Sequence, residues 1–305
     1  MTTINYYLVD VFTSKKYGGN QLAVFIDFEN ALCSNTMLTI ARELGFAEIT
    51  FIKKNNDNNC FEVRIFTPEY EVPFAGHPSL GTAYIIAKHL LSSAPKKIIL
   101  QLKHADIEIE ISNPKNLEAS NFIMKQAAPE FITNYSHQTI AGGLGINLTT
   151  LDLRKPIEEI STGLPYIIIP IAKKQHMQNL QLDAQKVIAF LKQHKKYKTN
   201  SINGLTTSLF FTCEETHESQ NQYNTRMFLI ENNNLIEDAA TGSANGCFLA
   251  YLLKNQTSFI NATVEQGFEM GRKSYIQLNG NIIDDTYQIK VGGQVVPVGI
   301  GKWCI

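Results

Sequence analysis

The chain has 305 residues, of which 44% are hydrophobic and 18% charged, and its formal net charge is -1. This balance indicates a folded protein rather than a disordered one, and the length suits two domains. The near-neutral charge gives no indication of a nucleic-acid partner, and the apolar runs are too short for a membrane span.

The first part of the chain alternates strands with two helices. Asn35 is expected to cap a helix that runs to Leu44, and Gly45 to end it. A second helix is expected to begin at Gly76, directly before His77 and Pro78. Strands are predicted at residues 6–12, 22–26, 46–52, 61–66, 98–102 and 107–111.

The same order of elements recurs after residue 155. An apolar strand follows a Gly/Pro turn, then come a helix, two strands, and "EDAATGSANG" opening an apolar helix. Arg64 and Arg226 each stand two residues before a phenylalanine. We interpret this as a duplication, which predicts two similar halves, each with its own core, and a ligand-binding cleft where they meet.

Each half therefore has a motif helix, defined here as the helix that begins at Gly76 or at Gly242. The first backbone N–H groups of a helix have no partner within it, and a glycine leaves them accessible. Such an end favours an anion, so two motif helices are expected to bind one small carboxylic acid.

Three side chains near these helices are candidates for proton transfer. Glu48 lies in a predicted strand, where it is either a solvated surface group or a half-buried carboxylate able to exchange a proton near pH 7. Asp238 is either a helix cap or a site residue. His77, at a helix N-terminus, is expected to be neutral, and a purely structural role stays open. Ser79 and Ser243 are equally plausible as caps.

Several other chemistries are excluded. The dinucleotide and P-loop glycine patterns and the G-x-S-x-G elbow are absent, and the glycine-rich Ala141–Asn147 is interpreted as a connector. His77 and His89 are too far apart for a metal pair, so we expect no metal and no cofactor. The five cysteines are widely spaced and the N-terminus lacks a secretory pattern, so we expect free thiols and a cytoplasmic location.

Together the motifs identify the chain as resembling the PhzF-like proteins of phenazine biosynthesis. The resemblance rests on "GGNQLAVF", "ELGFAEITF", "RIFTPEYEVPFAGHPSLGTA", "EDAATGSANG", "EQGFEMGRKS" and "VGGQVVPVGIGKW", in this order over nearly the whole chain. It implies the α+β diaminopimelate-epimerase fold: two pseudo-symmetric halves, each a curved, mostly antiparallel sheet around a central helix, with the active site between them. We expect the halves to be residues 1–125, with the strand at about 296–305, and residues 126–295.

The resemblance also implies a cofactor-independent isomerase that acts as a homodimer. Glu48 would be the acid/base, while His77, Asp238 and Ser243 would position the substrate and relay protons. Gly76 and Gly242 would supply backbone N–H groups. The substrate would be a small cyclic or amino-acid-derived carboxylic acid. The alternative is a non-catalytic metabolite-binding or interaction protein that retains the isomerase cleft.

Some positions differ from the family and from related epimerases. Ala239 and Lys273 stand where the family usually has proline, which leaves the substrate open. Amino-acid epimerases of this fold carry a cysteine before each motif glycine, but Ala75 and Thr241 stand there, and Cys247 is well inside the second motif helix. The residues therefore exclude a two-thiol racemase.

Overall fold

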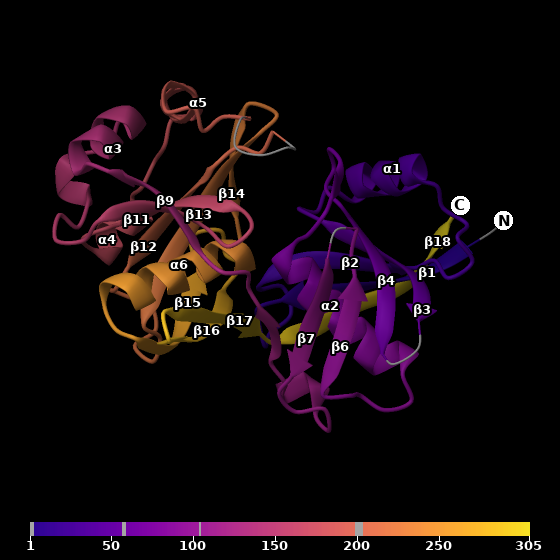
Figure 1. Cartoon of the computed structure of the whole chain (residues 1–305). Coiled ribbons are helices and arrows are strands. Elements are labelled where there is room, and N and C mark those ends of the chain that lie inside the picture. Colours follow the sequence, from indigo (N-terminus) through magenta and orange to yellow (C-terminus); the bar gives the residue numbers. More distant parts are fainter. Residues whose placement is uncertain (1–2, 57–58, 104, 199–203) are drawn as a thin grey trace. The chain divides into compact units, whose positions relative to one another are not determined.

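The computed structural model describes residues 3–305 apart from 57–58, 104 and 199–203. The chain divides into two compact units (Figure 1). Unit 1 comprises Met1–Lys125 and Gly292–Ile305, and unit 2 comprises Gln126–Val291. Each unit has its own set of strands and its own buried helix, so each is described by itself.

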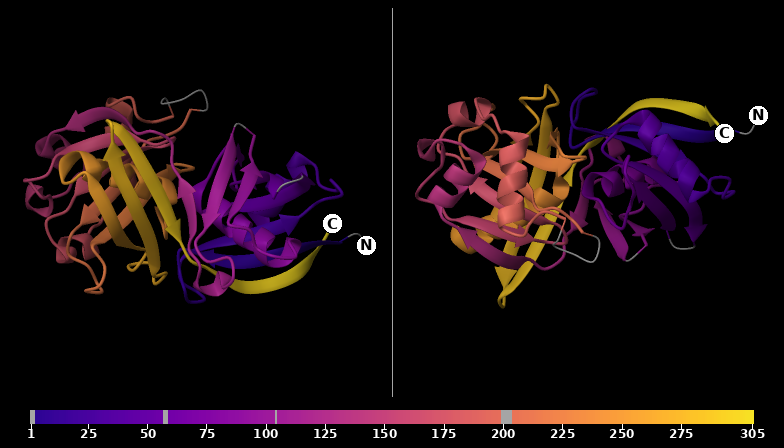
Figure 2. Two further views of the ribbon diagram at one scale, coloured as in Figure 1. Left: turned by 60° about the horizontal axis from the view of Figure 1, so that its bottom comes forward. Right: turned by 90° about the horizontal axis from the view of Figure 1, so that it is seen from above.

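Unit 1 consists of nine described strands with helices between them. The strands are β1 (Thr3–Val11), β2 (Asn20–Ile26), β3 (Ile49–Asn56), β4 (Cys60–Phe66), β5 (Glu71–Val72), β6 (Lys97–Gln101), β7 (Asp106–Ile111), β8 (Phe122–Lys125) and β18 (Val295–Cys304). The helices are α1 (Ser34–Leu44), α2 (Gly76–Ile85), its π-helical continuation η1 (Ile86–Leu90) and the short 3-10 turn η2 (Leu117–Ala119). Figure 2 shows β18 beside β1, with which it pairs antiparallel.

Unit 2 has the same kinds of element with more helices on the outside. The strands are β9 (Glu130–Tyr135), β10 (Ile157–Ser161), β11 (Pro165–Pro170), β12 (Ser208–Cys213), β13 (Tyr223–Glu231), β14 (Asn234–Asp238), β15 (Phe259–Gln266), β16 (Ser274–Ile283) and β17 (Thr286–Gly293). The helices are α3 (His137–Leu144), η3 (Leu148–Thr150), α4 (Lys174–Gln178), α5 (Ala184–Gln193) and α6 (Gly242–Asn255).

The two units share one pairing pattern. In unit 1, β1 pairs antiparallel with β2, β2 parallel with β3, and β3 antiparallel with β4; β4 pairs antiparallel with β5 and parallel with β6. In unit 2, β10, β11, β12, β13, β14 and β15 repeat these relations in the same order. Parallel neighbours require a crossover, and helices provide it at the same two points in each unit. The predicted α+β fold of two similar halves is confirmed.

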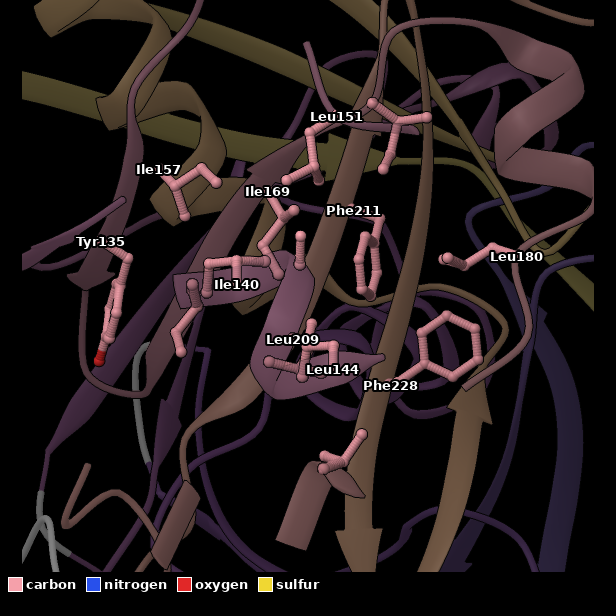
Figure 3. Packing of buried hydrophobic residues seen from close by; sticks show 14 of the residues in the cluster. Tyr135, Ile140, Leu144, Leu151, Ile157, Ile169, Leu180, Leu209, Phe211 and Phe228 are labelled. Atoms are coloured by element: carbon pink, nitrogen blue, oxygen red, sulfur yellow. The ribbon is translucent and has the colours of Figure 1, made fainter. Parts of the chain in front are cut away.

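Each unit places one helix in its interior and others on the outside of its sheet. All ten residues of α2 are buried, as are the first twelve of α6. Outside the sheet of unit 2, apolar side chains of α3 and α5 pack on β11, β12 and β13, and Figure 3 shows Ile140, Leu144, Phe211 and Phe228 in this core. In unit 1, α1 covers a smaller core of the same kind. The expected motif helices are therefore the central helices.

The duplication extends to one ion pair in each unit. Arg64 on β4 donates from Nε and Nη2 to the two carboxylate oxygens of Glu71 on β5, over 2.8 and 2.7 Å. Arg226 on β13 donates to Glu237 on β14 over the same two distances. The guanidinium carbons lie 5.0 Å from the Phe66 ring centroid and 4.9 Å from that of Phe228. Each ion pair links the strand that precedes a motif helix, β5 or β14, to its neighbouring strand.

Two local expectations were wrong. The N-cap of α1 is Cys33 and not Asn35, which lies within the first turn of the helix. Ala141–Leu144, expected to be a connector, forms the last turn of α3, which Ser136 caps at the start by accepting a hydrogen bond from the Thr139 N–H. The expected helix end at Gly45 is found, with a φ of 64°. Among the described helices, none is both long and apolar enough to cross a membrane.

Candidate active site

The first motif helix, α2, begins where the sequence predicts. Ala75 is its N-cap and Gly76 its first residue. Ser79 does not cap the helix, because its hydroxyl donates back to the Ala75 carbonyl over 2.8 Å. The N-cap residue offers no side-chain hydrogen bond to the helix. The first N–H groups of α2 thus receive no side-chain cap from Ala75, as an anion-binding helix end requires.

His77 is held as a neutral imidazole in the first turn of α2. Its side chain is buried, and burial lowers the pKa of His77 to about 3, although a hydrogen bond with the Gln21 backbone acts in the opposite direction. The expected neutral form is found, with burial and not the helix dipole as its main cause. Among the described residues, His77 Nε2 has no hydrogen-bond partner. A buried nitrogen without a partner is costly, and a bound ligand would satisfy it.

The structure brings Glu48 to this histidine. Glu48 stands one residue before β3, and its side chain is half-buried, with 22% of it exposed. Its Oε2 lies 3.7 Å from His77 Nδ1. This distance is longer than a hydrogen bond, but catalytic contacts are often loose before substrate binds. Glu48 is therefore a partly exposed carboxylate that faces a buried imidazole.

Burial of His77 predicts a specific loss of stability in acid. The unfolded chain takes up a proton on this histidine below about pH 6.5, whereas the folded chain does so only near pH 3. The free energy of unfolding therefore decreases by about 1.4 kcal/mol for each unit by which the pH is lowered between these values, because of this one group. We expect His77→Asn to lose less stability than the wild type between pH 6.5 and 4.5 in urea unfolding. Equal pH slopes for the two proteins would show that His77 protonates readily in the folded state.

The second motif helix, α6, has a more polar entrance. Its N-cap is Thr241 and its first residue Gly242, so neither Asp238 nor Ser243 is the cap. Asp238 is the last residue of β14, and its Oδ2 accepts a short hydrogen bond from the Thr241 hydroxyl. The Ser243 hydroxyl lies 2.7 Å from the hydroxyl of Tyr166 on β11, and both are buried. The structure thus brings Asp238, Thr241, Ser243 and Tyr166 together in unit 2.

Tyr166 is a candidate site residue that the sequence analysis missed. It lies in "LPYIIIP", where the aliphatic neighbours suggested only a buried strand. A buried tyrosine hydroxyl needs a hydrogen-bond partner, and this requirement was the available signal. The partner, Ser243, is 77 positions away in the chain.

Of the two departures from the family pattern, Ala239 lies in the turn before α6 and Lys273 in the loop after β15. Ala239 is buried, and its carbonyl oxygen accepts from the Ser274 hydroxyl over 2.8 Å. Gly267 has a φ of +73°, and a Cβ there would stand 2.6 Å from the same Ala239 oxygen. Lys273 lies over the Phe268 ring and pairs with Glu218 at 3.2 Å. The loop after β15 therefore packs closely on the turn that carries Asp238.

The cysteines provide no acid/base pair in either unit. The positions before the motif glycines, Ala75 and Thr241, are the N-caps of α2 and α6. Cys247 is buried inside α6, and burial raises the pKa of its thiol to about 12. A thiol of this kind is protonated at neutral pH and does not act as a base. In the described part of the chain, no group of three or more His, Cys, Asp or Glu residues is arranged to hold a metal ion.

Comparison with known proteins extends over nearly the whole chain. The model of the family described as "Phenazine biosynthesis-like protein" matches residues 9–301. An uncharacterized isomerase of Mesorhizobium japonicum is 29% identical over 308 residues, with 99% of each chain covered. A trans-2,3-dihydro-3-hydroxyanthranilate isomerase of Pseudomonas chlororaphis is 28% identical over 303 residues, with 97% of this chain and 98% of the relative covered.

Solved structures agree with this match. The crystal structure of a PhzF-family phenazine biosynthesis protein from Bacillus anthracis covers 100% of both chains with a TM-score of 0.87 at 26% identity. A hydroxyproline epimerase from Agrobacterium vitis covers 98% of this chain and 92% of its own, with a TM-score of 0.59 at 9% identity, and shares the fold alone. The relatives are named isomerases, so the chain is of the isomerase class. The resemblance found in the motifs is confirmed, and the chain belongs to the phenazine biosynthesis-like (PhzC-PhzF) family.

Proposed function

We propose that this protein is a cofactor-independent isomerase that moves a proton between two carbons of a small carboxylic acid, with Glu48 as the acid/base. The observation that carries the proposal is the half-buried Glu48 carboxylate, 3.7 Å from the buried, neutral His77. A carboxylate in such surroundings takes a proton from one carbon and returns it to another. The substrate loses and regains one proton, so the reaction needs no oxidant or reductant.

The remaining site residues bind the same substrate in this proposal. His77, uncharged, offers Nε2 to a polar group of the substrate. Backbone N–H groups at Gly76 and Gly242 bind its carboxylate, because helix N-termini favour anions. Asp238 and Ser243, each held by a neighbouring hydroxyl, position the substrate and relay protons. We further propose that the active form is a cytoplasmic homodimer without a nucleic-acid partner, as the family resemblance implies.

The substrate class is proposed from the relatives. One of them is named for trans-2,3-dihydro-3-hydroxyanthranilate, which is a small cyclic acid. We therefore expect a panel of cyclic and amino-acid-derived acids, including this one, to contain a substrate. In heavy water the product should gain deuterium at the carbon that receives the proton. Saturable binding of panel members without any isomer formation would instead indicate the alternative function, a metabolite-binding protein that retains the site.

A further inference from the structure

Gln266, the last residue of β15, uses every hydrogen-bonding group of its side-chain amide to hold the N-terminus of α6. The residue is fully buried. Its Oε1 accepts from the Thr241 N–H over 3.1 Å and from Asn245 Nδ2 over 3.1 Å. Its Nε2 donates to the Asp238 carbonyl over 2.9 Å and to the Thr241 hydroxyl over 2.9 Å. A primary amide has two donor hydrogens and two acceptor lone pairs, so every hydrogen-bonding position is used.

The partners give this network a direction. A backbone N–H can meet only Oε1, and a backbone carbonyl can meet only Nε2, so the amide has one possible orientation. Nε2 therefore donates to the Thr241 oxygen, and the Thr241 hydroxyl is left to donate to Asp238 Oδ2. A fixed chain of hydrogen bonds thus runs from Gln266 through Thr241 to one oxygen of the Asp238 carboxylate.

The described part of unit 1 lacks this arrangement at the equivalent place. Its first helical turn is held by Ser79, which bonds to the Ala75 carbonyl as Asn245 bonds to that of Thr241. The strand registers make Arg64 of unit 1 equivalent to Arg226 of unit 2. Extending the register of β4 and β6 by one residue past Gln101 then makes Leu102 the equivalent of Gln266. A leucine side chain has no hydrogen-bonding group, so it cannot hold the turn as Gln266 does. The glutamine thus occurs only in the unit whose motif turn carries an aspartate.

We propose that Gln266 is a positioning residue, which acts through Thr241 to hold the Asp238 carboxylate in its working orientation. This inference rests on the proposed function, in which Asp238 contacts the substrate. Gln266 itself serves as a rigid buried support, and Gly267 directly after it lets the Asp238 turn approach the end of β15. Precise orientation of such a group matters because small displacements of catalytic side chains reduce turnover strongly.

The first test follows hydrogen exchange of the Thr241 amide, which needs no substrate. We expect Gln266→Met to increase exchange at Thr241 and its neighbours in the first turn of α6. The control is Tyr251→Phe, nine residues beyond Gly242 on the same helix, which removes a partly buried hydrogen bond to the Pro156 carbonyl. It should leave exchange at Thr241 unchanged. Unchanged exchange in Gln266→Met, or an equal increase in both variants, would overturn the proposal.

The second test is a double-mutant cycle on turnover of a substrate found for the wild type. Gln266→Met and Thr241→Val should each lower kcat by roughly 10- to 100-fold, and the double variant should be little worse than either. Thr241→Ser, which keeps the hydroxyl, should restore most of kcat, and Tyr251→Phe should not lower it. Fully additive losses, or an unchanged kcat in Thr241→Val, would show that Gln266 does not act through Thr241.

The two tests separate the two proposals. If Gln266→Met does not fold, the pair Thr241→Val and Thr241→Ser still tests the hydroxyl link by itself. If exchange at Thr241 responds but kcat does not, Gln266 only stabilises the turn and the positioning role is wrong. If the wild type isomerises no acid of the panel, the proposed function fails, whereas the exchange result on Gln266 stands independently.

Discussion

Glu48→Gln is expected to lower isomerase turnover by about 10²- to 10⁴-fold while substrate binding survives. Glutamine has the size and polarity of the carboxyl group but cannot ionise, so it neither takes nor returns a proton. The half-buried position beside His77 suits the exchange of protons, and the similar size of glutamine should preserve the packing there. Steady-state kinetics and calorimetric titration of both proteins with the same acid measure the two effects.

Two further variants sharpen this test. Glu48→Asp keeps the carboxylate but withdraws it by one methylene, and proton transfer depends steeply on distance, so a small residual activity is expected. Glu43→Gln removes an exposed carboxylate five residues earlier, on α1, and should leave turnover at the wild-type level. Wild-type turnover in Glu48→Gln would refute the proposed mechanism, and Asp238 would become the next candidate for the acid/base.

The largest loss of stability is expected from Arg226→Met, at about 3–5 kcal/mol. Only 9% of the Arg226 side chain and 16% of that of Glu237 are exposed. Arg226 Nη1 also donates to the Met177 and Leu180 carbonyls, over 2.8 and 3.2 Å. Methionine fills a similar volume but leaves the Glu237 carboxylate without this partner, and a buried charge without its partner is strongly unfavourable.

The duplicated fold offers a matched comparison for this prediction. Arg64 and Glu71 form the same bidentate pair in unit 1, but with 24% and 21% of their side chains exposed. Water can solvate the remaining carboxylate there, so Arg64→Met should cost only about 1–2 kcal/mol. The double variant Arg226→Met with Glu237→Leu should recover part of the loss. Denaturant unfolding of the wild type and these three variants measures the losses of stability. Equal losses in Arg226→Met and Arg64→Met would contradict the burial argument.

The local errors in the sequence analysis have physical causes. Cys33 and Asn35 stand two positions apart at the start of α1, and intrinsic capping preference favours the asparagine, although the backbone enters the helix at the cysteine. In α3, three glycines in Ala141–Gly145 suggested a connector because glycine weakens a helix. However, a Cβ at Gly143 would stand 2.3 Å from the Phe190 ring of α5, so the packing of the two helices needs a glycine there.

Features that depend on the local order of residues could be predicted from the sequence. The repeated succession of strands and helices, the helix end at Gly45 and the motif helices beginning at Gly76 and Gly242 follow from backbone preferences and apolar periodicity within a few residues. The motifs also determined the family, because several blocks in a fixed order over most of the chain are specific together. Glu48 and His77 were candidates from their places near the motif helices, and the resemblance implied a role for each.

The surroundings of these groups depend on the tertiary structure. Glu48 and His77 come together because β3 and α2 pack in one unit, and burial by several elements keeps the imidazole neutral. Ser243 meets Tyr166, and Asp238 is linked through Thr241 to Gln266, across separations of 77 and 28 residues. Periodicity and capping rules reach only a few residues along the chain, whereas these contacts depend on which strands become neighbours in the sheet.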